Sequence, residues 1–150
     1  MSVGVGDRAP AFTLTGVGGT VHSLSDYAGK PVVLVFYPGD DTPVCTKQLN
    51  SYNSGLGEFE RLGAQVLAIS AQDVASKDRF SDRNGFKFPL LADPDKAVAS
   101  LYGTLGPIGF PRRSVFVVDA AGFIRYAHRA IAGLTYRPVS ELVEAIEQAS

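Results

Sequence analysis

The sequence is poor in the residues that form disulfides and metal sites. Its 150 residues include one cysteine, two histidines and no tryptophan. A single cysteine cannot form an internal disulfide, and the spacing of cysteine and histidine matches no metal-finger pattern. A protein that exchanges an internal dithiol with a disulfide is therefore excluded. The lack of a disulfide framework favours a reducing compartment, so we expect a cytoplasmic location.

The sequence also lacks an excess of charge and a long apolar run. The formal net charge is −1, which gives no basic surface for nucleic acid. No apolar segment approaches membrane-spanning length, and residues 1–8 lack the apolar core of a signal peptide. We therefore expect neither nucleic acid nor a membrane as a partner. The length and the 45% hydrophobic content predict one domain over residues 1–150, with a full core.

The order of hydrophobic patterns predicts an α/β protein. Apolar and polar residues alternate at 11–15 and 20–24, on either side of glycines, which indicates an N-terminal β-hairpin. Apolar runs at 32–37 and 64–70 indicate core strands, and a helix between them makes the pair parallel. The glycines at 16–19 lack the lysine and hydroxyl residue that end a phosphate-binding loop, so a turn is the better interpretation.

The remaining segments complete a mixed sheet flanked by helices. The pattern predicts a polar, exposed helix over 73–84, and glycines at 55 and 57 predict a bend in the helix after the cysteine. A C-terminal helix over 139–149 is expected to turn its apolar side chains to the core: Leu142, Val143 and Ile146. The other predicted elements are a helical turn at 25–30, a strand at 89–92, a helix at 95–102, a glycine- and proline-rich loop at 104–111, and a hairpin formed by 114–119 and 123–128.

The only cysteine lies where a buried strand gives way to a helix. Pro38 ends the strand, Thr42 has the residue type of an N-cap, and Pro43 takes the first helical position. Val44 is then second and Cys45 third. An N-cap hydroxyl accepts from the N–H two or three residues on. We therefore expect the Thr42 hydroxyl to accept from the N–H of Cys45 and to lie near the sulfur.

A cysteine in this position is suited to act as a nucleophile. The first turn of a helix has N–H groups without partners and carries partial positive charge. Both favour the thiolate, which is the reactive form of cysteine. Catalytic groups in parallel sheets also lie at the carboxyl ends of strands. The competing interpretation of Cys45 is a small buried hydrophobic residue, the usual state of a lone cysteine.

The residues around the cysteine resemble the peroxiredoxin family. Pro38, Thr42 and Cys45 have the family's P-x-x-x-T-x-x-C spacing, and the segment at 37–48 is similar to the Q-type, or bacterioferritin-comigratory, branch. The resemblance covers nearly the whole chain. It implies a thioredoxin-like fold and cysteine-dependent reduction of hydroperoxides, with no metal and no organic cofactor.

The resemblance also implies roles for residues at the start of the helix. Thr42 would contact the sulfur and the bound peroxide. Pro38 would shield the site from water, although a simple strand terminator explains it equally well. Backbone N–H groups at the helix start would help to orient the peroxide, and we include Val44 as a supporting residue.

A cation is expected beside the thiolate. In peroxiredoxins an arginine precedes a strand of the type x-x-F-x-x-D, and counting back along 114–119 selects Arg113. Side chains alternate along a strand, so Arg112 should face the other way. Gln48 shares a helix face with Cys45 and would hold the arginine. The competing interpretations are a solvated loop arginine and a solvated helix glutamine.

The sequence departs from the Q-type pattern at one position. Many members have a second, resolving cysteine five residues after the first, where this chain has Asn50. We therefore expect a one-cysteine mechanism, in which Cys45 becomes a sulfenic acid that an external thiol reduces. That thiol would be a small molecule, thioredoxin or a glutaredoxin-like protein. The predicted enzyme is a thiol-dependent peroxidase for hydrogen peroxide or organic hydroperoxides, acting as a monomer or homodimer.

Two alternatives remain open from the sequence. A thioredoxin-fold redox sensor or binding protein would keep the thiol but turn over little. A cysteine hydrolase would need a histidine base, and no motif surrounds His22 or His128. The charged residues close to the cysteine are interpreted as solvated: Asp40, Asp41 and Lys47.

Overall fold

A seven-stranded mixed sheet forms the centre of the computed structural model, which describes residues 3–106, 109, 111–130 and 135–149. The strands follow the order β2-β1-β5-β4-β3-β6-β7. Their bounds are β1 (Thr13–Gly16), β2 (Val21–Ser23), β3 (Val32–Phe36), β4 (Gln65–Ser70), β5 (Leu90–Ala92), β6 (Ser114–Val118) and β7 (Ile124–Arg129). The predicted 104–111 loop lies in part outside the described residues.

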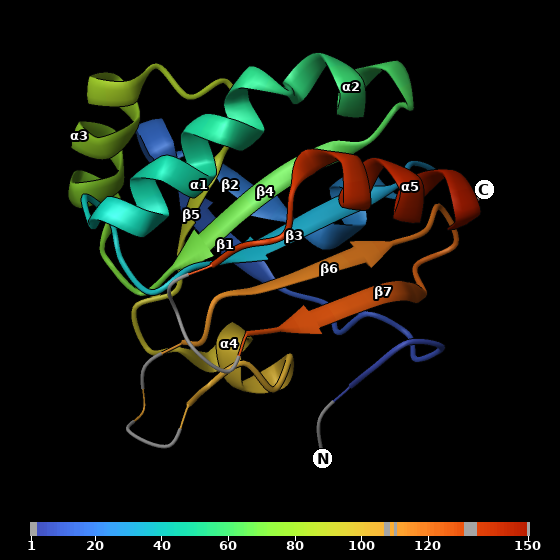
Figure 1. The fold of residues 1–150 in the computed structure, drawn as a ribbon. Coiled ribbons are helices and arrows are strands. Elements are labelled where there is room, and N and C mark those ends of the chain that lie inside the picture. The colour runs from blue at the N-terminus through green and yellow to red at the C-terminus, as the bar shows by residue number, and fades with distance from the viewer. Residues whose placement is uncertain (1–2, 107–108, 110, 131–134, 150) are drawn as a thin grey trace.

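Helices cover both faces of this sheet (Figure 1). The helices are α1 (Pro43–Ser54), α2 (Leu56–Arg61), α3 (Val74–Asn84), α4 (Ala97–Leu101) and α5 (Val139–Ala149), with the 3-10 turns η1 (Val17–Gly19) and η2 (Leu24–Tyr27). Helices α1, α2, α3 and α5 lie on one face and α4 lies on the other. The predicted C-terminal helix is confirmed in its bounds, and its three apolar side chains are buried.

The strand pairing confirms the predicted hairpins and the parallel pair. Strands β1 and β2 are antiparallel, β6 and β7 are antiparallel, and β3 runs parallel to β4. Strand β6 pairs antiparallel with the other edge of β3, in a register that sets Ser114 opposite Phe36. The start of β6 therefore lies beside the end of β3. This register places Arg113, the residue before Ser114, near the end of β3, where the chain leaves the sheet toward α1.

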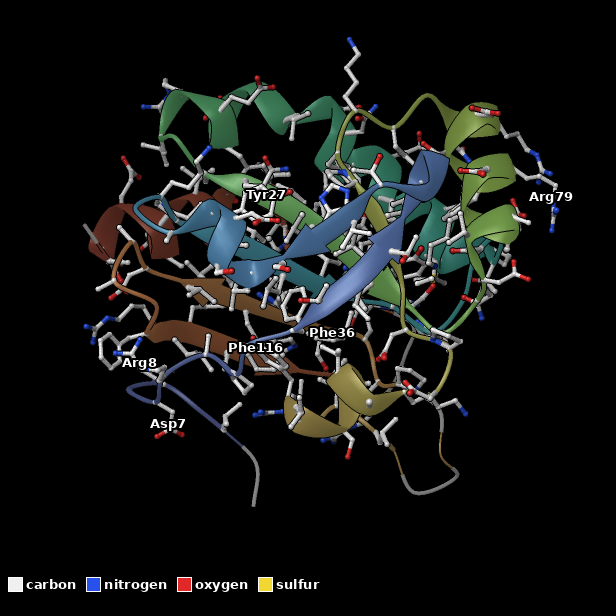
Figure 2. All side chains as sticks on the ribbon, turned by 180° about the vertical axis from the view of Figure 1, so that it is seen from behind. Asp7, Arg8, Tyr27, Phe36, Arg79 and Phe116 are labelled. Carbon is white, nitrogen blue, oxygen red and sulfur yellow. The ribbon has the colours of Figure 1, made fainter. Side chains whose placement is uncertain are left out.

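Two hydrophobic clusters hold the layers together. On one face, Cys45, Leu49 and Tyr52 of α1 pack with the inner residues of α5 and with β3. On the other face the core is rich in aromatic rings, among which Phe36 and Phe116 lie with centroids 5.8 Å apart (Figure 2). Burial of both sheet faces explains why β3, β4 and β6 read as continuous apolar runs rather than as alternating ones.

The predicted bend after the cysteine helix is a break between α1 and α2. Gly55 lies at the break, with Ser54 ending α1 and Leu56 beginning α2. A Cβ atom at Gly55 would lie 2.9 Å from Cγ2 of Val139, which is closer than such atoms approach in proteins. The break therefore lets α5 pack directly against the backbone of the cysteine helix.

Helix α3 differs from its prediction in one respect. Asp73 caps it by accepting from the N–H of Ser76 at 2.9 Å, and Gly85 ends it in a left-handed conformation. The helix is not exposed throughout, because Lys77 and Phe80 are buried. Residues three apart share a helix face, so Lys77 enters the protein beside Phe80.

Candidate active site

The cysteine lies in the first turn of α1, as the sequence predicts. Thr42 has extended backbone angles, φ −84° and ψ 148°, and its carbonyl accepts from the N–H of Thr46 at 2.9 Å. Pro43 is the first helical residue, so Cys45 is the third. The Cys45 side chain packs into the core, and only 1% of the residue is exposed. The thiol is therefore both buried and placed at the positive end of a helix.

The predicted hydroxyl cap is wrong. The Thr42 hydroxyl donates to the carbonyl of Gly39 at 2.9 Å and accepts no N–H from the helix. The physical reason is the tight turn before the helix, in which Asp41 adopts a left-handed backbone with φ 61°. This turn brings the Gly39 carbonyl within reach of the hydroxyl. Thr42 as a residue is exposed.

Arg113 reaches the sulfur from the start of β6. Its Nη1 lies 3.3 Å from Sγ of Cys45 and 2.6 Å from Oε1 of Gln48. Only 4% of Arg113 is exposed, so this charge acts where water screens it little. A hydrogen bond from a guanidinium is strongest to an acceptor that carries negative charge. Among the described residues, no other arginine bonds the sulfur, and Arg112 is not part of the cluster.

Gln48 is buried rather than solvated, and it continues the chain of hydrogen bonds. Its Nε2 donates to the hydroxyl of Tyr52 at 3.2 Å, and that hydroxyl donates to the carbonyl of Arg137 at 2.7 Å. Burial raises the pKa of Tyr52 to about 12, so the hydroxyl keeps its proton and acts as a donor. The orientation of the Gln48 amide is thereby fixed, with its oxygen toward Arg113. Sequence reasoning missed Tyr52, although its spacing of four residues from Gln48 was a signal.

The other predicted residues border this cluster. Val44 and Pro38 are half-buried. The Pro38 carbonyl accepts from Nε2 of Gln72 at 3.5 Å, which ties the turn to the segment after β4. Lys47 is exposed, as predicted.

The interpretation of Asp40 as solvated is wrong. Its side chain is 1% exposed and lies 3.3 Å from Nζ of Lys77, whose side chain is 0% exposed. Asp41 follows in the chain but is 40% exposed, and it pairs with Arg83 at 2.6 Å. Sequence reasoning missed Lys77. The signal was its place on the same helix face as Phe80.

Neither histidine joins the cysteine. His22 lies on the edge strand β2, and its Nδ1 is 2.8 Å from the hydroxyl of Tyr27. Three strands separate β2 from β3, which leads to the cysteine. His128 lies on β7 at the opposite edge. A histidine-assisted hydrolase therefore finds no support in the described part of the chain. Within the same residues, no helix has the length and apolar character needed to cross a bilayer, and no cluster of metal-ligating side chains occurs.

Comparisons with known proteins identify a family and a shared fold. The sequence model of the AhpC/TSA family matches residues 5–127. A Mycobacterium tuberculosis protein named as a peroxiredoxin is 41% identical over 126 residues, which are 79% of this chain and 80% of that protein. The structure of a Xylella fastidiosa PrxQ mutant superposes with a TM-score of 0.90 at 28% identity and covers 99% of this chain and 98% of that one. Xanthomonas campestris bacterioferritin comigratory protein gives a TM-score of 0.84 at 30% identity, over 91% and 90% of the two chains.

Proposed function

The chain belongs to the AhpC/TSA family and is a thiol-dependent peroxidase with a single cysteine, and from this premise we propose that Cys45 is the residue that attacks the peroxide. The observation that carries the proposal is the contact between Arg113 and the sulfur, 3.3 Å long in a buried site. Such a cation favours the thiolate before attack. It also stabilises the charge that develops on the departing oxygen.

The proposed reaction has balanced steps. The Cys45 thiolate attacks one peroxide oxygen, forming a sulfur–oxygen bond while the oxygen–oxygen bond breaks. The leaving oxygen takes a proton and departs as water or an alcohol, and Cys45 is left as a sulfenic acid. One external thiol then forms a mixed disulfide with release of water. A second thiol frees Cys45 and completes the external disulfide.

The remaining residues are assigned supporting roles. Gln48 holds the guanidinium of Arg113 through the 2.6 Å bond to its Oε1. Thr42 offers its hydroxyl oxygen to the peroxide while its proton binds the Gly39 carbonyl. Pro38 limits the access of water, and the helix start at Val44 provides backbone N–H groups to the bound oxygens.

The substrates and the reductant follow from the same premise. The Xanthomonas relative is described by its alkyl peroxide reduction activity, so organic hydroperoxides are proposed beside hydrogen peroxide. Because Asn50 stands where a resolving cysteine would be, the reductant is external: a small thiol, thioredoxin or a glutaredoxin-like protein. A location that supplies such thiols, the cytoplasm, is proposed with it, and the chain acts as a monomer or homodimer.

The proposal is tested with one equivalent of hydrogen peroxide and an excess of free cysteine. Reduced protein is mixed with both, Cys45 is trapped with a sulfenic-acid reagent, and the intact mass is measured. We expect Cys45 to be oxidised in preference to the free thiol, and the Cys45→Ser variant to stay unmodified. A Cys45 that reacts no faster than free cysteine would overturn the proposal.

One observation favours a second candidate, a redox sensor. The sulfur of Cys45 belongs to a residue that is only 1% exposed, which restricts the approach of a reductant larger than a peroxide. Peroxide consumption with excess reductant separates the two functions. Many turnovers per chain indicate the enzyme, whereas a single oxidation event per chain indicates the sensor.

A further inference from the structure

Lys77 is a fully buried lysine on helix α3. Its side chain is 0% exposed, whereas Arg79, two residues further along α3, extends away from the protein (Figure 2). Nζ of Lys77 donates to Oδ1 of Asp40 at 3.3 Å, to the hydroxyl of Tyr37 at 3.2 Å, and to Oγ of Ser70. A buried ammonium is tolerated only with such partners. The partners come from the ends of β3 and β4 and from the turn between β3 and α1.

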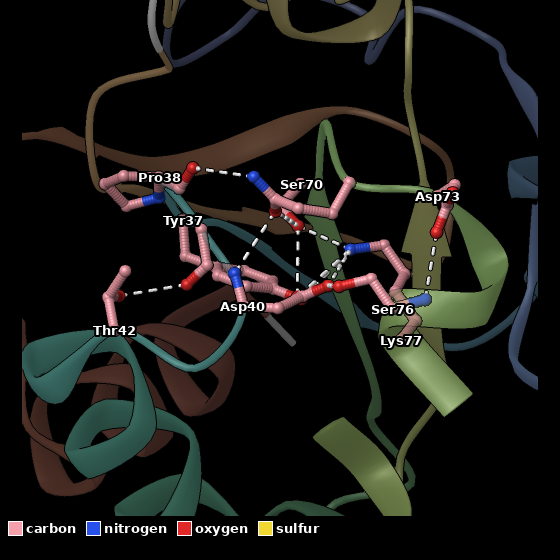
Figure 3. A network of polar contacts seen from close by, with 10 residues as sticks. Tyr37, Pro38, Asp40, Thr42, Ser70, Asp73, Ser76 and Lys77 are labelled. Atoms are coloured by element: carbon pink, nitrogen blue, oxygen red, sulfur yellow. Dashed lines mark hydrogen bonds and ion pairs between the residues drawn. The ribbon is translucent and has the colours of Figure 1, made fainter. Parts of the chain in front are cut away.

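Asp40 gathers these bonds onto the turn that leads to the cysteine (Figure 3). Its carboxylate accepts from the hydroxyl of Tyr37 at 2.6 Å and from Oγ of Ser76 at 2.7 Å. The backbone is held as well, because the N–H of Asp40 donates to Oε1 of Gln72 at 3.2 Å. The turn is therefore fastened to α3 and to the end of β4 through both its side chain and its main chain.

The same turn carries the groups assigned to the peroxide. Pro38 and Thr42 stand on either side of Asp40, and the Thr42 hydroxyl is fixed by the Gly39 carbonyl within this turn. Lys77 bonds the turn and does not bond the sulfur, so we assign its effect on the reaction to the position of the turn. Reacting groups must be held closely, since a displacement of about 1 Å can cost about a hundredfold in rate.

We propose that Lys77 is a positioning residue for peroxide reduction, and that its ammonium charge, acting on Asp40, holds the Pro38–Thr42 turn in the conformation that receives the peroxide. This inference rests on the proposed function of Cys45 and goes beyond it. It assigns a requirement for a charge on α3, a helix that provides no group in contact with the sulfur.

The charge on Lys77 is sensitive to pH in an accessible range. Burial lowers the pKa of Lys77 to about 8, against the opposing effect of the carboxylates of Asp40, Asp73 and Asp93. The hydroxyl of Tyr37 also faces the amine, and burial together with Asp40 raises its pKa, so Tyr37 stays protonated. As the pH rises through 8, the amine loses the charge that binds it to Asp40. We expect the hold on the turn to weaken over this range.

The test compares two reagents for the same thiol. Rate constants for hydrogen peroxide and for iodoacetamide are measured from pH 6 to pH 9 for wild type, Lys77→Met and Lys77→Arg. Alkylation needs the thiolate but not the peroxide-binding turn. At pH 7 we expect Lys77→Met to lose about tenfold with peroxide and less than about threefold with iodoacetamide, within the range that misplacement produces. In wild type the peroxide rate should fall above pH 8 relative to the alkylation rate, and in Lys77→Met this fall should be absent.

The matched control is Arg83→Met, which removes an exposed ion pair between the same helix and the same turn. It should follow wild type with both reagents. Should Lys77→Met fail to fold, the Asp40→Asn/Lys77→Met double variant leaves no lone buried charge, and it should show the same selective loss. The proposal is overturned if Lys77→Met loses both reactivities equally or keeps the wild-type peroxide rate and pH profile. A wild-type Cys45 no faster than free cysteine would instead remove the proposed function itself.

Discussion

Two buried cations approach the start of α1 from different sides, and they differ in what they bond. Arg113 comes from the start of β6 and directs Nη1 at the sulfur and at the neutral oxygen of Gln48. Lys77 comes from α3 and bonds the carboxylate of Asp40, which offsets its charge. Arg113 thus bonds the reacting sulfur directly, whereas Lys77 bonds a carboxylate of the turn that leads to α1. Burial alone does not assign the role of a cation; its partner does.

Arg83 forms an exposed ion pair that resembles the buried pair of Lys77 with Asp40. Arg83 joins α3 to the turn through Asp41, next to Asp40 in the chain, and its side chain is 61% exposed. We call Lys77–Asp40 the inner pair and Arg83–Asp41 the outer pair. Both connect α3 to the turn before α1, and they differ mainly in their exposure to water. Water screens the outer pair, and such pairs contribute little to stability.

Removing the charge beside the sulfur should have the largest effect. Arg113→Ala is expected to lower the second-order rate constant for hydrogen peroxide about 100- to 1,000-fold, because a donor to the developing negative charge is lost. Stopped-flow kinetics measure the rate. Arg113→Lys keeps the positive charge but lacks the planar guanidinium. Its rate constant should lie between those of wild type and Arg113→Ala. A loss of less than threefold in Arg113→Ala would show that the contact with the sulfur is not catalytic.

Removing the charge of Lys77 should cost more stability than removing the charge of Arg83. Lys77→Met leaves the Asp40 carboxylate buried without its cation, a change that costs about 3–5 kcal/mol in comparable buried pairs. Urea denaturation measures the free energy of unfolding. The Asp40→Asn/Lys77→Met double variant should recover part of the loss. Equal costs for Lys77→Met and Arg83→Met would remove the distinction between the inner and outer pairs.

The pH dependence of stability sharpens the comparison, because burial lowers the pKa of Lys77. The pKa of Lys77 is about 8 in the folded protein and 10.5 for the unperturbed side chain. Between these values the unfolded chain holds a proton that the folded chain has released, so this group makes the free energy of unfolding rise with pH. The contribution is lost again as the pH falls through 8.

The quantity to measure is the free energy of unfolding of wild type minus that of Lys77→Met. This difference should increase by up to about 3 kcal/mol between pH 8 and pH 10.5. Taking the difference cancels groups that titrate in both proteins. Stability should therefore rise over the range in which the peroxide rate falls. A difference that stays flat would mean that Lys77 keeps an ordinary pKa in the folded protein.

Gln48 tests whether the orientation of Arg113 matters beyond its charge. Gln48→Ala removes the acceptor at 2.6 Å and should lower the peroxide rate about five- to tenfold, consistent with one hydrogen bond of roughly 1 kcal/mol. Gln48→Glu keeps an acceptor and should retain more activity than the alanine variant. If both variants match wild type in stopped-flow kinetics, the arginine is held by other contacts.

Arg83→Met should have the smallest effect. We expect a change in the free energy of unfolding below about 0.5 kcal/mol and an unchanged peroxide rate, because the pair with Asp41 is exposed. High salt should reduce even this difference. A cost near that of Lys77→Met would mean that the surface pair, not the buried one, holds the turn.

The features that depend on residues close in sequence could be predicted from it. The start of α1 at Pro43 follows from local residue types, and the parallel pairing of β3 with β4 follows from the intervening helix. Arg113 was selected by its position before a strand, through resemblance to a family. The buried pair could not be found in this way. Asp40 and Lys77 lie 37 positions apart, and each appears as a solvated charge until α3 packs over the turn.

The Thr42 hydroxyl shows a second kind of limit. Its two possible partners, the helix N–H groups and the Gly39 carbonyl, lie within a few residues of one another in the sequence. The left-handed backbone of Asp41 determines which of them the hydroxyl meets. Residue types predict that a cap residue stands here, but the path of the turn determines the bond that it makes.

Two glycines, Gly55 at the break between α1 and α2 and Gly57 just after it, differ in how well they can accept a side chain. Any side chain at Gly55 must push Val139 away, whereas Gly57 has open space around its Cα. Val139 begins the helix that follows Arg137, whose carbonyl receives the hydrogen bond from Tyr52 and so ends the chain from Arg113. In a library of random variants, alanine at position 57 should survive selection for peroxide resistance and alanine at position 55 should be depleted. Two glycines in one bend would then show very different mutational tolerance.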